Sequence, residues 1–392
     1  MSNKLPKTGV FAGGLALFSM FFGAGNLVWP LILGGEAGDK SLFAVAGLLI
    51  TGVTLPLLGL MSMMLFRGEY HNFFAKAGRV TGFIILFLVQ AILGPLGSIP
   101  RLITLAHATL KPYLPDQINF TLFTLLSCLI IFLFALKKHR VVDIIGLILT
   151  PILLACLGLI FILGFHNPPE PQTVAIEKQQ VFFSGLNVGY NTLDLIASFI
   201  FASLVMSYFQ QNKKEEETVE ARRQVFKKMI KACSIAGILL AAMYMGLTYL
   251  ASYYKPLLPD HAPEEGLGLI AIHLLGAKGA LFACIAISLS CLTTAIPISI
   301  VCSDYIHKIF LKKQTNSHLG TLILLVLSAA VANLGFMGIA EMLSPILQIL
   351  CPGLIILSVF NILHKLYEVR IRRAPIFVAF ALAFIYLMAG NF

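Results

Sequence analysis

FSMFFGAGNLVWP, Phe18 to Pro30, lies midway along the first long apolar run of the chain, which extends from about Thr8 to Leu33. Within bilayer hydrocarbon, an unbroken helix would be needed to keep the backbone amides hydrogen-bonded. Two glycines on either side of Ala24, followed by Asn26 and Pro30, weaken that helix at its centre. Interrupted helices at membrane depth survive only where the freed peptide groups face protein, water or a ligand. The stretch therefore predicts a binding site inside a membrane.

The composition of the 392-residue chain places it in a membrane. Hydrophobic residues make up 58% of it, charged residues only 12%, and the mean hydropathy is +0.90. In a typical soluble protein, roughly a quarter of all residues are charged. The net charge of +10 could suggest nucleic-acid binding. The basic residues are spread among short loops, however, so membrane orientation explains them better and no nucleic-acid partner is expected.

Apolar runs separated by polar loops predict eleven membrane spans and hence an all-α polytopic membrane protein. They lie near 8–33, 41–66, 80–108, 119–136, 141–165, 184–209, 229–253, 278–310, 319–334, 339–363 and 374–390. Twenty-two loop lysines and arginines fall on the side where odd-numbered spans begin, and five on the other side. Because positively charged loops remain in the cytoplasm, the N-terminus is predicted to be cytoplasmic.

A second interruption, GYNTLD from Gly189 to Asp194, lies in the sixth span. Asp194 is the deepest acid in any span, where a charge costs at least a few kcal/mol and usually serves a pathway or a partner. A capping or helix-pairing aspartate is the less favoured reading. Spans one to five and six to ten would each open with an interrupted helix and enter the membrane from opposite sides, which predicts an inverted repeat with a site between its halves.

This repeat divides the chain into three parts. The expected divisions are a first five-span repeat at 1–166, a second at 167–363 with a cytoplasmic connector at 210–228 and an outer cap at 255–277, and an additional C-terminal span within 364–392.

The two interruptions suit a zwitterionic ligand. Freed amides of Gly23, Ala24 and Gly25 lie near the positive end of a half-helix and can hold a carboxylate, whereas unwound carbonyls can hold an ammonium group or a cation. Hydroxyls of Thr293 and Thr294 in the eighth span could complete an oxygen cage for sodium. They could equally well bond their own backbone carbonyls.

Other polar groups carry less information. Arg101 follows a glycine- and proline-rich segment of the third span, and its charge could pair with an acid or, as favoured, extend to the interface. The seven cysteines lie inside apolar runs and the nine histidines are scattered, so neither a metal site nor a membrane-embedded enzyme is expected. The spans are also too apolar for the polar stripe of a channel.

Four motifs, in order, resemble the branched-chain amino acid:cation symporter family, the bacterial system II carriers of leucine, isoleucine and valine. They are GAGNL with Pro30, GP with IPR in the third span, GY with Thr192 and Asp194, and CLTTA in the eighth span. The resemblance implies a leucine-transporter-like fold, cation-driven uptake through the bacterial cytoplasmic (inner) membrane, and no catalysis. Members of the family usually have twelve spans, one more than this sequence shows, and the twelfth would lie outside the ten-span core.

The resemblance also implies roles for individual residues. Substrate would be held by Gly23, Ala24, Gly25 and Asn26 together with Tyr190, Asn191, Thr192 and Asp194. Sodium would be held by the carbonyls of Ser19 and Phe22 with Thr293 and Thr294. A proton carried by Asp194 is the alternative to sodium. Besides the amino acid, membrane lipid is the expected partner, and a monomer is compatible with the sequence.

Overall fold

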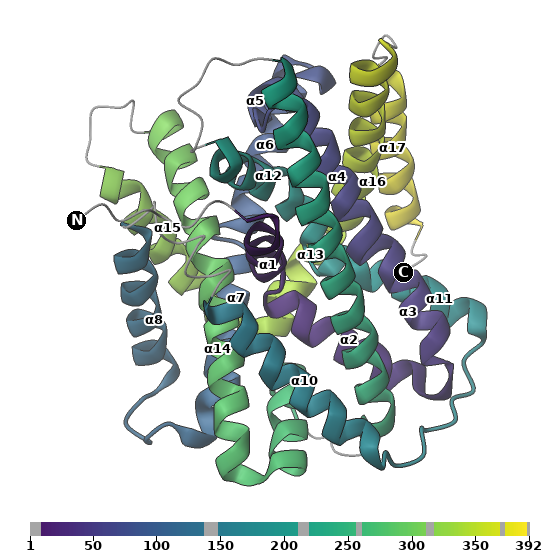
Figure 1. Cartoon of the computed structure of the whole chain (residues 1–392), viewed down its shortest axis with the longest axis vertical. Coiled ribbons are helices and arrows are strands. Elements are labelled where there is room, and N and C mark those ends of the chain that lie inside the picture. The colour runs from purple at the N-terminus through teal and green to yellow at the C-terminus, as the bar shows by residue number, and fades with distance from the viewer. Residues whose placement is uncertain are drawn as a thin grey trace.

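The first predicted span is two separate helices. The computed structural model describes residues 9–136, 148–210, 219–255, 261–310, 317–368 and 373–389, and its regular elements there are all helical (Figure 1). Helix α1 (Val10–Phe21) has 12 residues and α2 (Ala24–Ala37) has 14. At about 1.5 Å per residue, neither alone crosses about 30 Å of hydrocarbon. Phe22, with a ψ of 76°, and Gly23, with a ψ of −157°, separate them.

The sixth predicted span is broken in the same way. Helix α11 (Lys178–Asn191) ends before Thr192, and α12 (Asp194–Gln210) begins two residues later. Leu193 between them has a φ of +69°. This left-handed conformation is costly for a side chain with a Cβ, and such residues persist where the surrounding structure holds them. Both interruptions predicted from glycine and polar residues are therefore present.

The remaining predicted spans each correspond to one helix or to a jointed pair. The pairs are α3 (Ser41–Leu49) with α4 (Leu55–Leu65), joined by a π-helical turn at Ile50–Thr54, and α6 (Arg79–Leu93) with α7 (Ser98–Leu110). The single helices are α8 (Phe120–Ala135), α10 (Thr150–His166), α13 (Val219–Tyr254), α14 (Gly266–Phe310), α15 (Ser317–Ala332), α16 (Gly335–Tyr367) and α17 (Ala374–Met388).

Short helices occupy the ends of the bundle. They are α5 (Tyr70–Phe74) and the 3-10 turns Gly38–Lys40, Ala75–Ala77, Lys111–Tyr113 and Pro263–Glu265. Gly276, with a φ of +66°, turns the chain inside α14, so a short helix precedes the long one. Residues 211–218 of the predicted connector at 210–228, and residues 256–260 of the predicted cap, lie outside the described residues, and the rest of the connector after 218 is the start of α13.

Length and composition support a membrane protein. Within the described ranges, six helical stretches are long and apolar enough to cross a membrane, and five apolar helices are shorter. Most of the large apolar side chains that remain exposed belong to these helices, for example Phe83, Leu125, Ile162, Ile238, Phe282 and Leu382. An exposed apolar surface on so many helices is what lipid requires.

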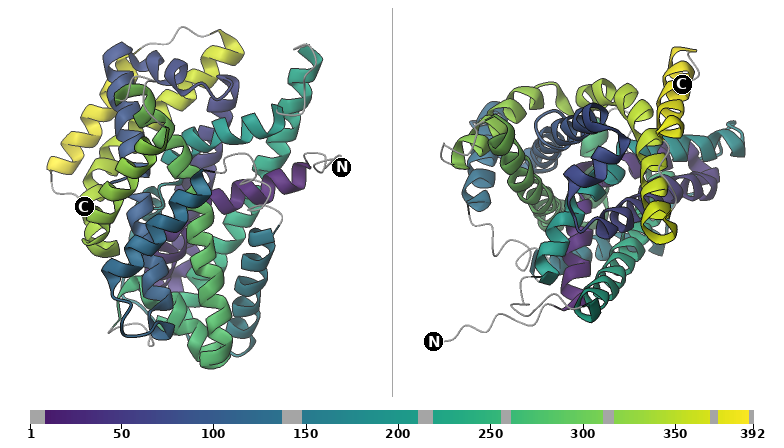
Figure 2. Two further views of the ribbon diagram at one scale, coloured as in Figure 1. Left: turned by 90° about the vertical axis from the view of Figure 1, so that its left-hand side faces the viewer. Right: turned by 90° about the horizontal axis from the view of Figure 1, so that it is seen from above.

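The broken helices form the centre of the molecule. In Figure 1, α1 lies near the middle, and it packs against α12, α13 and α14. Phe18 and Phe22 of the first break are fully buried, as are Phe199 and Phe201 of α12. By contrast, α17 lies at the periphery against α16 (Figure 2). The two interruptions are thus enclosed by the other helices.

Candidate functional site

The two helix interruptions meet. A Cβ added to Gly25, in the first turn of α2, would lie 2.9 Å from the carbonyl oxygen of Thr192 at the end of α11. Real Cβ atoms do not approach other atoms so closely, so a residue without a side chain is required at this point of contact. The first turn of α2 and the break before α12 therefore form one site, with the free N–H groups of a helix beginning beside it.

Asn26 and Asp194 connect the two interruptions directly. The Asn26 amide Nδ2 donates to both carboxylate oxygens of Asp194, at 2.9 and 2.7 Å. The hydroxyl of Tyr244, on α13, donates to the Asp194 carboxylate and lies 2.5 Å from Asn26 Nδ2. Asn26 also accepts a 3.1 Å hydrogen bond from the Gly23 amide, which fixes the start of α2. All of these side chains are buried, where a hydrogen-bonded network is strong.

A small cavity of about 20 Å³ lies between the interruptions. This is room for about one water molecule, so the structure has a closed site. Polar side chains in its lining are those of Asn26, Ser98, Arg101, Thr192, Asp194 and Thr294, beside the small residues Gly23, Ala24 and Gly25. Its apolar lining is Met20, Phe21, Leu93, Leu193, Ala197, Phe201 and Ile298. The lining combines groups of both charges with an apolar wall.

Arg101 does not extend to the membrane interface, so the favoured expectation from the sequence is wrong. The residue is 1% exposed and lines the cavity. Its Nη1 donates to the carbonyl oxygen of Asn191 at 3.0 Å, and its guanidinium carbon lies 5.5 Å from the centre of the Phe336 ring. The break between α6 and α7, at Gly94–Gly97, starts α7 inside the protein and so places Arg101 in the core.

A cluster of oxygen atoms lies beside the first interruption. The Thr294 hydroxyl donates to the Ser19 carbonyl at 3.0 Å, and the Ser290 hydroxyl donates to the Phe22 carbonyl at 2.6 Å. Thr293 Oγ1 is 2.9 Å from Ser19 Oγ and donates to the Ser290 carbonyl at 2.8 Å. Helices α1 and α14 therefore bring together hydroxyl and carbonyl oxygens, the donor atoms that hard cations prefer.

The residues predicted from the sequence fall into three groups: those that line the cavity, those in the oxygen cluster, and two that belong to neither. Gly23, Ala24, Gly25, Asn26, Thr192, Asp194 and Thr294 line the cavity, and Ser19, Phe22 and Thr293 belong to the neighbouring oxygen cluster. Tyr190 and Asn191 lie at the end of α11 but outside the lining, and Asn191 contributes only its backbone carbonyl to Arg101.

Four polar residues of this region were not among the predicted site residues. They are Ser98, Arg101, Tyr244 and Ser290. A tyrosine in the middle of a span needs a partner for its hydroxyl, which is the signal that could have singled out Tyr244. Ser290 carries no such signal, because serine hydroxyls in membrane helices commonly bond their own helix.

Two solved structures share the fold of this chain. A mutant of a manganese transporter of Eremococcus coleocola aligns with a TM-score of 0.61 at 13% identity, over 98% of this chain and 88% of that one. A Na⁺-coupled sialic acid symporter, in a substrate-bound outward-open state, aligns with a TM-score of 0.58 at 11% identity, over 90% of this chain and 78% of the other. The chain thus has a leucine-transporter-like fold, and its apolar helices make it a multi-pass membrane protein.

Sequence comparison narrows this class to one family. A model described as "Branched-chain amino acid transport protein" matches residues 6–391. The branched-chain amino acid permease BrnQ of Bacillus subtilis is 31% identical over 378 residues, covering 94% of this chain and 84% of the permease. The permease BraB of the same organism is 30% identical over 377 residues, covering 94% and 83%. The chain belongs to the branched-chain amino acid transport protein family, whose named relatives are transporters and not enzymes.

Proposed function

We propose that this protein is a secondary transporter that takes up leucine, isoleucine and valine together with sodium by alternating access. The observation that carries the proposal is the meeting of two interrupted helices at one buried cavity, joined by Asn26 and Asp194. Such interruptions supply helix ends and free peptide groups for a charged solute near the middle of the bilayer. The relatives BrnQ and BraB are named as branched-chain amino acid permeases.

The apolar lining supports a branched aliphatic side chain as the other part of the substrate. Met20, Phe21 and Phe201 come from both interrupted helices, and Leu93 and Ile298 come from α6 and α14. An apolar pocket discriminates by only about 1–3 kcal/mol per methylene. Leucine, isoleucine and valine should therefore compete for one site.

The oxygen cluster between α1 and α14 supports sodium as the coupling ion. The carbonyls of Ser19 and Phe22 with the hydroxyls of Ser290, Thr293 and Thr294 would hold the cation. Its binding would tie α1 to α14 beside the amino acid. The ion gradient, with a membrane potential worth about 2.3 kcal/mol per charge at 100 mV, would then drive accumulation.

The site would have to open to bind substrate, because its cavity is small. A cavity of about 20 Å³ cannot hold leucine, so the helices around it would separate on one side to admit the substrate and on the other side to release it. We place the protein in the bacterial cytoplasmic membrane with a cytoplasmic N-terminus, as the loop charges indicate. A monomer would suffice, because one chain supplies both interruptions.

Proton coupling through Asp194 is the second candidate. The buried carboxylate of Asp194, held by Tyr244 and Asn26, could be neutralised by a proton in place of sodium binding nearby. This reading uses the same amino acid site and differs only in the ion.

Uptake of labelled leucine by purified protein in proteoliposomes tests both candidates. An inward sodium gradient at equal pH should drive accumulation that excess isoleucine or valine suppresses, while a pH gradient without sodium should not. Accumulation driven by the pH gradient alone would select the proton. No response to either gradient would reject cation symport.

A further inference from the structure

We propose that Arg101 of α7 binds the carboxylate of the transported amino acid, while Asp194 faces its ammonium group from the other interruption. The inference rests on the proposed function and names the group that recognises the substrate's negative charge. It differs from a site in which the amides at the start of α2 hold the carboxylate unaided.

The first observation is that the charged head of Arg101 is buried and only partly satisfied. The side chain is 1% exposed, and its Nε and Nη2 atoms have no hydrogen-bond partner, whereas Nη1 is bound to the Asn191 carbonyl. Buried polar groups are nearly always hydrogen-bonded, and an unpaired donor on a cation is especially costly. Two free donors on a residue lining a cavity indicate that something else occupies them during function.

The second observation is which two donors are free. Nε and Nη2 lie on the same edge of the planar guanidinium, and this edge is one that pairs with a carboxylate through two parallel hydrogen bonds. The remaining contacts fix the group without using that edge. Nη1 is held by Asn191, and the Phe336 ring lies 5.5 Å from the guanidinium carbon. This pair of donors, the Nε–Nη2 fork of Arg101, is thus already oriented to bind a planar anion.

The third observation is a separate negative charge in the same cavity. Asp194 lines it together with Arg101, yet among the described residues the two form no ion pair within 4.0 Å. Instead, Asp194 is held by Asn26 and Tyr244. Two opposite charges that are buried in one cavity without touching each other each need a partner. A solute with both a negative and a positive group can supply both partners at once, its negative group at Arg101 and its positive group at Asp194. A free α-amino acid fits, whereas an amine or an acid alone leaves one charge uncompensated.

The test compares leucine with leucinamide, which keeps the ammonium group and the side chain but lacks the carboxylate. Equilibrium binding to purified wild-type protein, Arg101→Gln and Arg101→Lys is measured in sodium, with thermal unfolding as a check on folding. Thr109→Ala is the matched control, because Thr109 is a buried residue of α7 whose hydroxyl bonds its own helix at Leu105.

The wild-type protein should bind leucine at least about tenfold more tightly than leucinamide. Arg101→Gln should lower leucine affinity about 100-fold or more and remove the preference over leucinamide. Arg101→Lys, which keeps the charge but not the fork, should keep part of the preference. Thr109→Ala should match the wild type.

Several results would overturn the assignment. A folded Arg101→Gln that keeps the wild-type preference, or that loses both ligands equally, would leave Arg101 with only the structural role of joining α7 to α11. If neither variant folds, density for leucine bound to wild-type protein decides, since its carboxylate must lie against Arg101 and not only against the amides of Gly23–Gly25. A wild type that binds no leucine would instead contradict the proposed function itself.

Discussion

Tyr244 shows how one hydroxyl can control the site. It donates to the Asp194 carboxylate from α13, and both residues are buried. Removing one partner of such a bond leaves a buried acceptor less satisfied, at a cost of about 1–3 kcal/mol. The effect should reach the substrate, because Asp194 lines the cavity.

We therefore expect Tyr244→Phe to weaken leucine binding about tenfold, equivalent to about 1.4 kcal/mol, as measured by equilibrium binding. Tyr254→Phe on the same helix is the control, because its hydroxyl bonds the Gly164 carbonyl away from the cavity. Equal leucine affinities in the two variants would show that the Tyr244 hydroxyl does not contribute to the binding site.

Thr294 offers a test of the oxygen cluster. Its hydroxyl lies 3.0 Å from the Ser19 carbonyl, across the contact between α14 and α1. Thr294→Ala should raise the sodium concentration for half-maximal leucine uptake about tenfold, since one oxygen of the proposed sodium site is lost. Ser328→Ala, which removes a buried hydroxyl that bonds its own helix at Leu324, should leave that concentration unchanged. An unaltered sodium dependence in Thr294→Ala would count against this site.

Single residues were predictable from the sequence where they break a local rule. Asn26 and Asp194 stand out as polar groups in apolar runs, and the structure joins them. The positive φ of Leu193 could not be predicted, because leucine has no preference for that conformation and only the surroundings impose it. Arg101 was misjudged because its depth depends on where α7 begins, which tertiary packing decides.

At the scale of elements, small residues hold the interrupted helices in place. A Cβ on Gly34 of α2 would lie 2.0 Å from the Thr248 carbonyl of α13, and one on Gly185 of α11 would lie 2.1 Å from the Ala44 carbonyl of α3. Close backbone approach at small residues is a principal source of helix association in membranes. These contacts attach α2 to α13 and α11 to α3, so one half of each interrupted span is packed closely against a neighbouring helix.

Gly34→Ala and Gly185→Ala should each lower the unfolding temperature of the purified protein, through about 1–3 kcal/mol of overpacking. Gly158→Ala in α10 is the matched control, because no atom lies within 4 Å of its added Cβ. There the gain in helix propensity should leave stability equal or slightly higher. Equal unfolding temperatures in all three variants would show that these close contacts do not hold α2 and α11.

The helices and both breaks could be predicted because hydropathy and glycine act locally. The joints within other spans were less predictable. The third span is divided at Gly94–Gly97 into α6 and α7, a separation that goes beyond a proline kink. The second contains a π-helical turn at Ile50–Thr54, where neighbouring helices decide the geometry.

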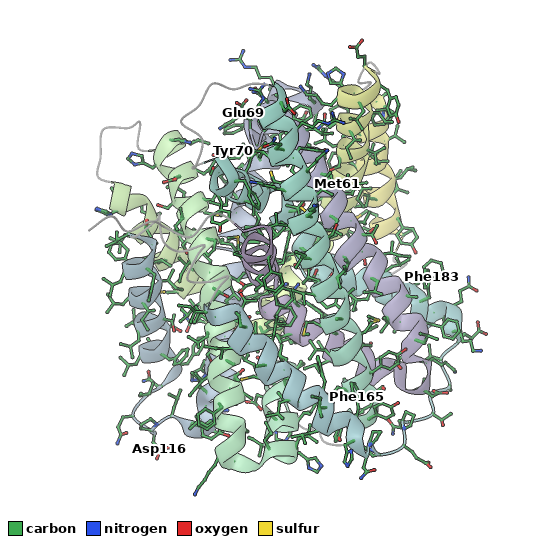
Figure 3. The ribbon with its side chains drawn as sticks, viewed as in Figure 1. Met61, Glu69, Tyr70, Asp116, Phe165 and Phe183 are labelled. Carbon is green, nitrogen blue, oxygen red and sulfur yellow. The ribbon has the colours of Figure 1, made fainter. Side chains whose placement is uncertain are left out.

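At the scale of the whole molecule, the loops form two opposite ends. Glu69, after α4, lies at one end and Asp116, after α7, at the other, with exposed apolar residues such as Met61 and Phe183 between them (Figure 3). The loop charges predict that the end with Glu69 faces the cytoplasm.

Cysteine labelling tests this orientation. In intact cells, a membrane-impermeant maleimide should label Asp116→Cys, whereas Glu69→Cys should react only after permeabilisation. Both positions are exposed, so access and not burial decides the result. The seven native cysteines are buried or half-buried, and the parent chain supplies the background. The reverse labelling pattern would place the N-terminus outside.

The most direct test of the central claim is a density map of the protein with leucine and sodium bound. We predict leucine between the first turn of α2 and the Thr192–Asp194 break, with the cavity expanded around it. Leucine located elsewhere, with both interruptions still closed on each other, would contradict the account.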